Sequence, residues 1–147
     1  MGYVVDDSRD RIDVDAVWGA LRGAYWGKWR SRDDVAAQIG NAWRVIGAYD
    51  ERSGAQVGFA RAVSDGLGFA YLADVIVFEG HRGRGLGKRI VRAMIDEGPG
   101  AHFRWTLFTS DAHGLYRQFG FTDPGPMALV RPPAELPVHP TQVAPPA

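Results

Sequence analysis

The sequence has no cysteine, no long apolar run and no net charge, and these absences exclude several classes of protein. Without cysteine there is no disulfide framework, no thiolate metal site and no cysteine nucleophile. No segment approaches the roughly 18 consecutive apolar residues of a membrane-spanning helix. The 17 basic and 17 acidic residues cancel, which gives no support for a nucleic-acid or membrane-surface binder. The first residues lack the basic and apolar regions of a signal peptide, so we expect a cytoplasmic protein.

Proline is scarce until the end of the chain, and its distribution divides the sequence. The 147 residues, 46% of them apolar, suit one globular domain with a workable core. From residue 132 prolines are frequent, and such a segment can form neither ladders nor helices. We expect a domain over residues 1–131 and a proline-rich, disordered tail over residues 132–147.

Apolar spacing predicts the order of secondary structure. Asp13 is suited to cap a first helix, and Ser31 with Asp34 resembles the capping box of a second. A turn over residues 50–54 between two β-prone runs predicts a hairpin. The expected strands cover residues 3–5, 43–49, 57–63, 69–78, 103–108 and 127–130, and the expected helices cover 14–25, 31–39, 86–95 and 112–119.

A basic, glycine-rich loop lies between the apolar strand ending at Phe78 and the helix that begins near Leu86. A helix N-terminus offers unpaired backbone N–H groups and partial positive charge, and glycine lets the backbone approach an anion closely. Basic side chains at Arg82, Arg84 and Lys88 add formal charge. This arrangement predicts a site for a phosphorylated ligand.

Two common phosphate-binding motifs do not match this loop, and in each case one residue makes the difference. A P-loop needs Ser or Thr after Gly-Lys to hold magnesium, but Arg89 follows Lys88. A dinucleotide fingerprint needs a third glycine where Lys88 stands. The pattern that fits is Arg-x-x-Gly-x-Gly, from Arg82 to Gly87, although glycine-rich turns also join strands to helices without any ligand.

This pattern resembles the acetyl-CoA pyrophosphate loop of the GNAT N-acetyltransferase family. A second segment, residues 111–121, resembles the C-terminal signature of that family, in which Leu115-Tyr116 begins the last helical turns and Gly120-Phe121 closes them. The resemblance covers about 130 residues and implies an α/β (α+β) fold. In that fold, a mixed, mostly antiparallel central sheet with flanking helices forms an acyl-CoA N-acyltransferase-like domain.

The resemblance also implies how acetyl-CoA would bind, as a co-substrate. Pantetheine would lie in a wedge between the strand ending at Phe78 and the strand ending at Phe108, bonded to the backbone around Val75 and Val77. The pyrophosphate would bind at the start of the following helix. The residues implied there are Arg82, Gly83, Arg84, Gly85, Gly87 and Lys88.

Acyl transfer to an amine has two proton-transfer tasks. Tyr116 stands where the family places its general acid, and a phenol is protonated at neutral pH; the alternative is that its ring only packs beside the pantetheine. Asp74 and His113 are the first candidates to assist the amine, and Asp65 and Asp111 are further ones. Asp74 interrupts an apolar strand, where it faces either the reacting centre or an arginine such as Arg61. His113 has a suitable side chain but is equally suited to a helix surface.

The acceptor is expected to be a small-molecule amine or a peptide amine, bound without any metal ion. Aromatic residues Tyr25, Trp26 and Trp29 are candidates to wall its pocket, and Asp65 to attract the amine, although the same aromatics could belong to the core. A homodimer is possible. Two other functions remain open at this point: a non-catalytic acyl-CoA-binding module, and a nucleotide-phosphate protein unrelated to CoA.

Overall fold

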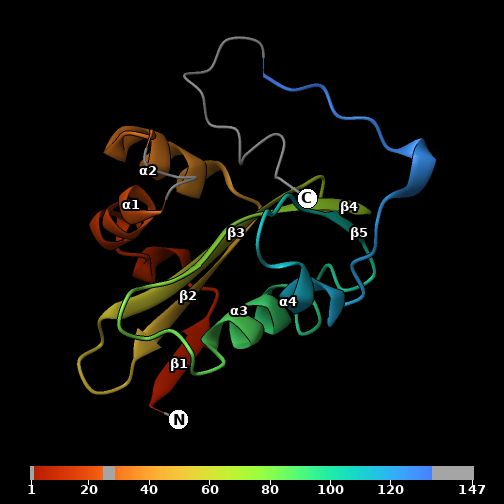
Figure 1. Cartoon of the computed structure of the whole chain (residues 1–147). Coiled ribbons are helices and arrows are strands. Elements are labelled where there is room, and N and C mark those ends of the chain that lie inside the picture. Colours follow the sequence, from red (N-terminus) through yellow and green to blue (C-terminus); the bar gives the residue numbers. More distant parts are fainter. Residues whose placement is uncertain (1, 25–28, 134–147) are drawn as a thin grey trace.

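The structure is a computed structural model that describes residues 2–24 and 29–133 (Figure 1). Its five strands form one sheet in the order β1-β2-β3-β4-β5, antiparallel except for the parallel pair β4 and β5. The strands are β1 Tyr3–Asp6, β2 Arg44–Asp50, β3 Gln56–Ser64, β4 Phe69–Val77 and β5 Arg104–Thr106. The helices are α1 Val14–Gly23, α2 Arg32–Asn41, α3 Leu86–Met94 and α4 His113–Arg117, with 3₁₀ helices at Arg9–Arg11 and Gly125–Met127. The expected mixed, mostly antiparallel sheet is confirmed.

Local sequence explains where the first two long helices begin. The Asp13 side chain accepts a hydrogen bond from the backbone N–H of Ala16, and so caps α1. Ser31 accepts from the backbone N–H of Asp34 while the Asp34 carboxylate accepts from the backbone N–H of Ser31. This reciprocal pair is the predicted capping box, and it satisfies two backbone donors at the start of α2.

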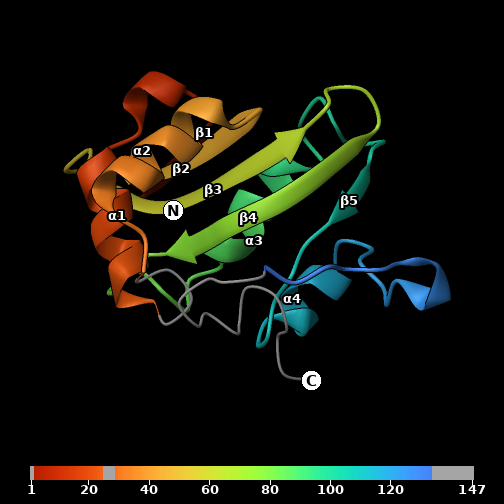
Figure 2. The same ribbon diagram turned by 90° about the horizontal axis from the view of Figure 1, so that it is seen from above.

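The sheet lies between two helical layers, and each layer buries its own core (Figures 1 and 2). Helices α1 and α2 cover one face, where Leu21 and Ile39 pack in a cluster with Phe59 of β3. Helix α3 covers the other face, where Ile90 packs in a cluster with Ile46 of β2. Because both faces are covered, the middle strands are apolar over most of their length.

Strands β4 and β5 pair for only a short distance and then diverge. Their register runs from Phe69 opposite Arg104 to Tyr71 opposite Thr106, whereas β4 continues to Val77. The β3–β4 register also shifts near Asp74, whose φ of 57° is left-handed and uncommon for a residue other than glycine. Within the described residues, the backbone of β4 beyond Tyr71 therefore has no strand paired on its β5 side, in agreement with the wedge that the family resemblance implies.

The predicted strand over residues 127–130 is wrong. Pro124 and Pro126 precede this run, and Met127 ends a 3₁₀ helix instead. The Met127 and Leu129 side chains are 93% and 95% exposed, so no burial stabilises an extended pairing there. Strand β5 is also shorter than the expected 103–108, because its neighbour β4 turns away from it after Tyr71.

Some expectations lie outside the described residues. Tyr25, Trp26 and nearly all of the proline-rich tail belong to residues 25–28 and 134–147, so their predicted roles stay predictions. No helix within residues 2–24 and 29–133 is both long enough and apolar enough to cross a bilayer.

Candidate functional site

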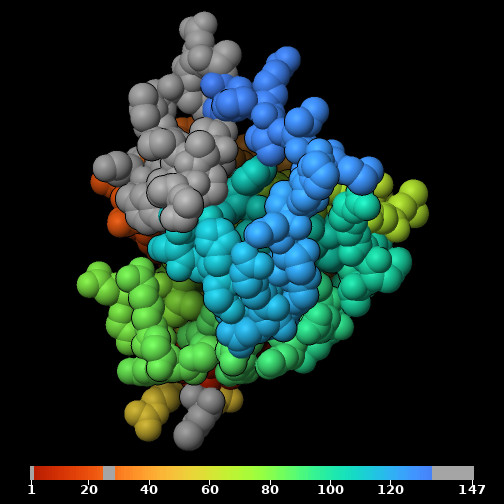
Figure 3. Space-filling model, turned by 45° about the vertical axis from the view of Figure 1, so that its right-hand side comes forward, coloured from red at the N-terminus to blue at the C-terminus, as the bar shows by residue number. Residues whose placement is uncertain are grey.

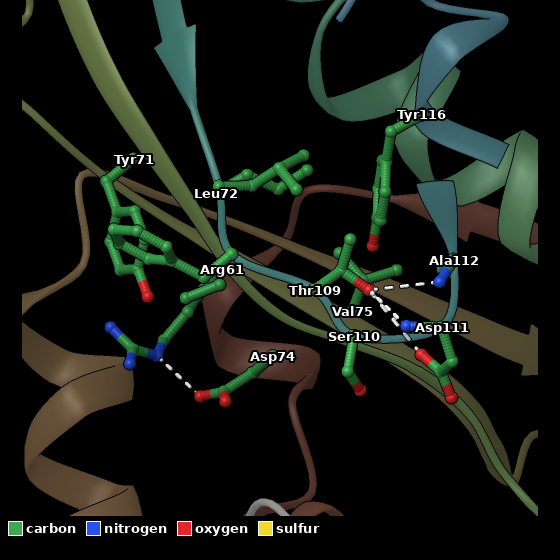
Figure 4. Close-up of a pocket in the computed structure, with 13 residues that line it drawn as sticks. Arg61, Tyr71, Leu72, Asp74, Val75, Thr109, Ser110, Asp111, Ala112 and Tyr116 are labelled. Atoms are coloured by element: carbon green, nitrogen blue, oxygen red, sulfur yellow. Dashed lines mark hydrogen bonds and ion pairs between the residues drawn. The ribbon is translucent and has the colours of Figure 1, made fainter. Parts of the chain in front are cut away.

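A cleft opens where β4 and β5 diverge, and it is the centre of the candidate site (Figure 4). It has a volume of about 120 Å³. One wall comes from β3 and β4, and the other comes from the segment that joins β5 to α4. Its lining includes Arg61, Tyr71, Leu72, Asp74 and Val75 on the first wall and Thr109, Ser110, Asp111, Ala112 and Tyr116 on the second.

The glycine-rich loop leads into the N-terminus of α3. Gly83 and Gly85 have φ values of 77° and 80°, so the loop needs residues that tolerate the left-handed region. Gly85 is the N-cap of α3 and has no side chain that could accept a hydrogen bond from the backbone N–H groups of the first turn. A Cβ added at either glycine would meet nothing within 4 Å. The N-terminus of α3 thus has no side-chain cap, and the space beside these two glycines is open, as a site for an anion would require.

The basic side chains of this loop differ in their contacts. Arg82 donates from Nε to the carbonyl oxygen of Val77 at 2.9 Å, and Arg84 donates from Nη1 to the hydroxyl of Tyr3 at 2.7 Å. Lys88 lies exposed in the first turn of α3. In the space-filling view the green segment that contains this loop lies beside the cyan segment that contains α4 (Figure 3). Contacts hold Arg82 and Arg84 against the end of β4 and β1.

The two valines implied in pantetheine binding have different positions on β4. Val75 lines the cleft, so its backbone lies at the unpaired edge. Val77 lies at the end of β4, and its carbonyl oxygen already accepts from Arg82. Both side chains are partly buried against the core under α3. Both side chains thus contribute to the core, and Val75 in addition lines the cleft.

Tyr116 reaches the cleft from α4. Its side chain is buried, packs edge-on against Phe121 and points toward the divergence of the strands (Figure 4). Burial, with a smaller contribution from the negative charge of Asp111, raises the pKa of Tyr116 to about 12. The phenol is therefore a proton or hydrogen-bond donor throughout the physiological range.

Asp74 meets two arginines. Arg30 donates from both Nη atoms to the two carboxylate oxygens at 2.7 and 2.8 Å, and Arg61 donates from Nε at 2.6 Å. Burial by itself raises the pKa of this carboxyl, but the hydrogen bonds from Arg30 and the positive charges of Arg61 and Arg30 lower it overall. The contacts favour the pairing alternative for Asp74 over the role of a base, because a lowered pKa makes a poor proton acceptor at neutral pH.

The other sequence candidates lie away from this centre. His113 is exposed at the start of α4 and lines a different hollow, beside the C-terminal segment. Asp65 accepts backbone hydrogen bonds from Leu67, Gly68 and Phe69, which lower the pKa of its carboxyl. The structure thus brings Tyr116 and Asp74 to one cleft, but not His113 or Asp65.

Sequence reasoning missed three features of the cleft. Arg30 was not linked to Asp74, because 44 residues separate them and no local pattern joins them. Tyr71 was treated as part of an ordinary strand. Thr109 Oγ1 accepts from the backbone N–H of Ala112 at 3.1 Å, so this hydroxyl braces the approach to α4. The position of Thr109 before the helix is a signal that could have revealed its role.

The mixed sheet splays beside a glycine-rich helix N-terminus, and this architecture can be compared with known proteins. Residues 41–123 match the model of the acetyltransferase (GNAT) domain. A solved structure from Xanthomonas campestris, assigned to the same family, is 34% identical with a TM-score of 0.81, and the alignment covers 90% of this chain and 93% of that one. A candidate acetyltransferase from Gibberella zeae is 30% identical over 116 residues, which are 76% of this chain and 63% of that protein.

The chain belongs to the GNAT acetyltransferase family. A Deinococcus radiodurans structure at 22% identity, with a TM-score of 0.71, shares the fold, and covers 88% of this chain and 89% of that one. The chain spans less than two thirds of the length of the Gibberella zeae protein. Among the described residues, no three His, Cys, Asp or Glu side chains gather as a metal site would require.

Proposed function

We propose that the protein is an acetyl-CoA-dependent N-acetyltransferase, which moves an acetyl group to a primary amine by direct attack in a ternary complex. The observation that carries this proposal is the cleft between β4 and β5, with Tyr116 on one wall and the open backbone edge of β4 on the other. The acceptor is an amine of a small molecule or a peptide.

The loop before α3 fits the pyrophosphate of acetyl-CoA. Its unfilled N-cap at Gly85, the open space over Gly83 and the exposed side chain of Lys88 suit a doubly charged anion. Val75 and Val77 would offer backbone groups to pantetheine. When bound there, acetyl-CoA supplies the activated acetyl group as a thioester.

Tyr116 is the proposed donor to the leaving sulfur. Because its pKa is about 12, well above that of a thiol near 8.5, complete proton transfer to a free thiolate would run uphill. A hydrogen bond from the phenol still stabilises negative charge as it develops on sulfur. Tyr116 is therefore better suited to hydrogen bonding in the transition state than to carrying the proton away.

The acceptor must lose a proton, and the residues of the cleft do not offer a strong base for it. Asp74 is engaged by Arg30 and Arg61, and His113 lies outside the cleft. We infer that water accepts the amine proton and that Asp74 positions the two arginines. A neutral amine fraction that rises with pH should then control the rate on the acid side of the profile.

The test combines binding with turnover. Calorimetry should detect one acetyl-CoA site per chain, and an amine library followed by CoA release should identify acceptors. Tyr116→Phe keeps the ring and removes the hydroxyl, so turnover should fall by about 10²–10³-fold, the usual loss when one donor to a developing negative charge is removed, while acetyl-CoA affinity stays near that of the parent protein. Equal turnover would exclude Tyr116 as the donor. A protein that binds acetyl-CoA but releases no CoA with any amine would instead be the non-catalytic acyl-CoA module.

A further inference from the structure

Three ionised side chains meet beside the cleft, and their charges do not cancel. The Asp74 carboxylate is bound by the guanidinium groups of Arg30 and Arg61, so these three groups together carry one positive charge; the exposed carboxylate of Asp34 interacts with Arg30 from outside the group. The exposed fractions of the three side chains are 5%, 1% and 12% respectively. A surplus charge with so little contact to water is costly unless an anion meets it.

Arg30 by itself makes hydrogen bonds to both carboxylate oxygens of Asp74. Its two Nη atoms bind both carboxylate oxygens, and Nη1 also donates to Gln38 Oε1 at 2.6 Å. Arg61 uses only Nε for Asp74, and its two Nη atoms make no hydrogen bond within residues 2–24 and 29–133. A guanidinium has five N–H donors, so Arg61 keeps most of its capacity.

Arg61 is also the member of the group that reaches the cleft. It lines the cleft together with Tyr71 and Asp74, whereas Arg30 does not. In Figure 4 the Arg61 guanidinium and the Tyr71 hydroxyl lie on one side of the cleft, and Tyr116 lies on the other. The nearest charge on the second wall is negative, from the exposed carboxylate of Asp111. The cleft is thus positive on its β3–β4 wall and negative on the wall leading to α4.

We propose that Arg61 binds a carboxylate of the acceptor, an inference that rests on the proposed transferase function. The planar Nη fork matches a carboxylate in two hydrogen bonds, which a neutral or cationic acceptor cannot accept. The amine end of the same molecule then lies toward Tyr116 and Asp111. The acceptor class is therefore amines that also carry a carboxylate, such as amino acids or short peptides.

The alternative is that Arg61 only holds Asp74 in place. If Arg61 has only a structural role, its replacement should change kcat/KM by the same factor for every acceptor. If it binds the acceptor, its replacement should change the ratio of kcat/KM values between acceptors. Arg61→Gln removes the charge while Asp74 keeps both bonds from Arg30, so this variant is expected to fold. Arg61→Lys retains the charge and loses the fork. Arg52→Gln, in the exposed β2–β3 turn, is the matched control.

The experiment compares matched acceptors with acetyl-CoA: leucine against leucinamide, and 4-aminobutyrate against 4-amino-1-butanol. In the parent protein and in Arg52→Gln, kcat/KM per neutral amine for the better carboxylate acceptor should exceed that of its uncharged partner by about 10- to 100-fold. Arg61→Gln should bring this ratio close to one, and Arg61→Lys should restore part of it. Thermal unfolding and acetyl-CoA calorimetry on each variant show whether it is folded and binds the co-substrate, so that a changed ratio is not the result of misfolding.

The outcomes distinguish this inference from the function on which it rests. Turnover without preference for the carboxylate acceptor, or a preference unchanged in Arg61→Gln, would overturn the role of Arg61 and leave the transferase intact. Acetyl-CoA binding without CoA release for any of the four amines or the wider library would overturn the transferase proposal, and the acceptor class with it.

Discussion

The replacement Asp74→Asn tests whether Asp74 is a structural ion pair or a base. Asparagine keeps the shape of the side chain but removes the only carboxylate between Arg30 and Arg61. Two nearly buried guanidinium groups would then face each other without a counter-ion. Breaking a buried pair by removing one partner costs about 3–5 kcal/mol. For a chain of this length, that loss corresponds to a fall in Tm of about 6–20 °C.

Thermal unfolding followed by circular dichroism measures this change, and Asp15→Asn is the matched control. Asp15 also pairs with one arginine, Arg32 at 2.5 Å, but its side chain is 71% exposed, so Tm should stay close to that of the parent protein. A double-mutant cycle with Arg30→Gln should show that the paired replacements cost less than their sum. An Asp74→Asn protein that unfolds at the parent Tm but loses turnover would refute the structural reading and restore Asp74 as a candidate base.

Three further predictions concern the loop, a close contact in the sheet and the buried phenols. Gly85→Val should weaken acetyl-CoA binding in calorimetry, whereas Gly54→Val, at a similar φ of 75° in a distant turn, should not. Gly47→Ala places a Cβ too close to the ring and hydroxyl of Tyr49, so chemical denaturation should show a loss of about 1–3 kcal/mol in the free energy of unfolding; an unchanged midpoint would contradict this contact. Burial raises the pKa of Tyr49 to about 12, as it does for Tyr116. The contribution of each neutral phenol to the free energy of unfolding is fully present below pH 10. It should fall by up to about 3 kcal/mol per tyrosine as the pH rises from 10 to 12. Tyr49→Phe should make the total fall smaller.

Local sequence was sufficient to predict most of the helices and strands and to identify the family. The capping box at Ser31 and Asp34, the hairpin after β2 and the glycine-rich start of α3 depend on residues within a few positions of one another. Interactions at that range can be read along the chain, because helix caps and tight turns have fixed spacings. The same reasoning failed at residues 127–130, where β-prone side chains have no neighbouring surface to bury them.

Tertiary structure decided the charge of the cleft. The sequence singled out Asp74 as a costly carboxylate in an apolar strand, and it named Arg61 as one possible partner, but it could not show that Arg30 binds the same group. Those two arginines lie 44 and 13 residues from Asp74, and β3 and the start of α2 bring them together. Charge balance depends on every group within a few ångströms, so it is fixed only when the chain has folded. The sequence therefore determined the family and the position of the glycine-rich loop, and the fold determined which side chains line the cleft.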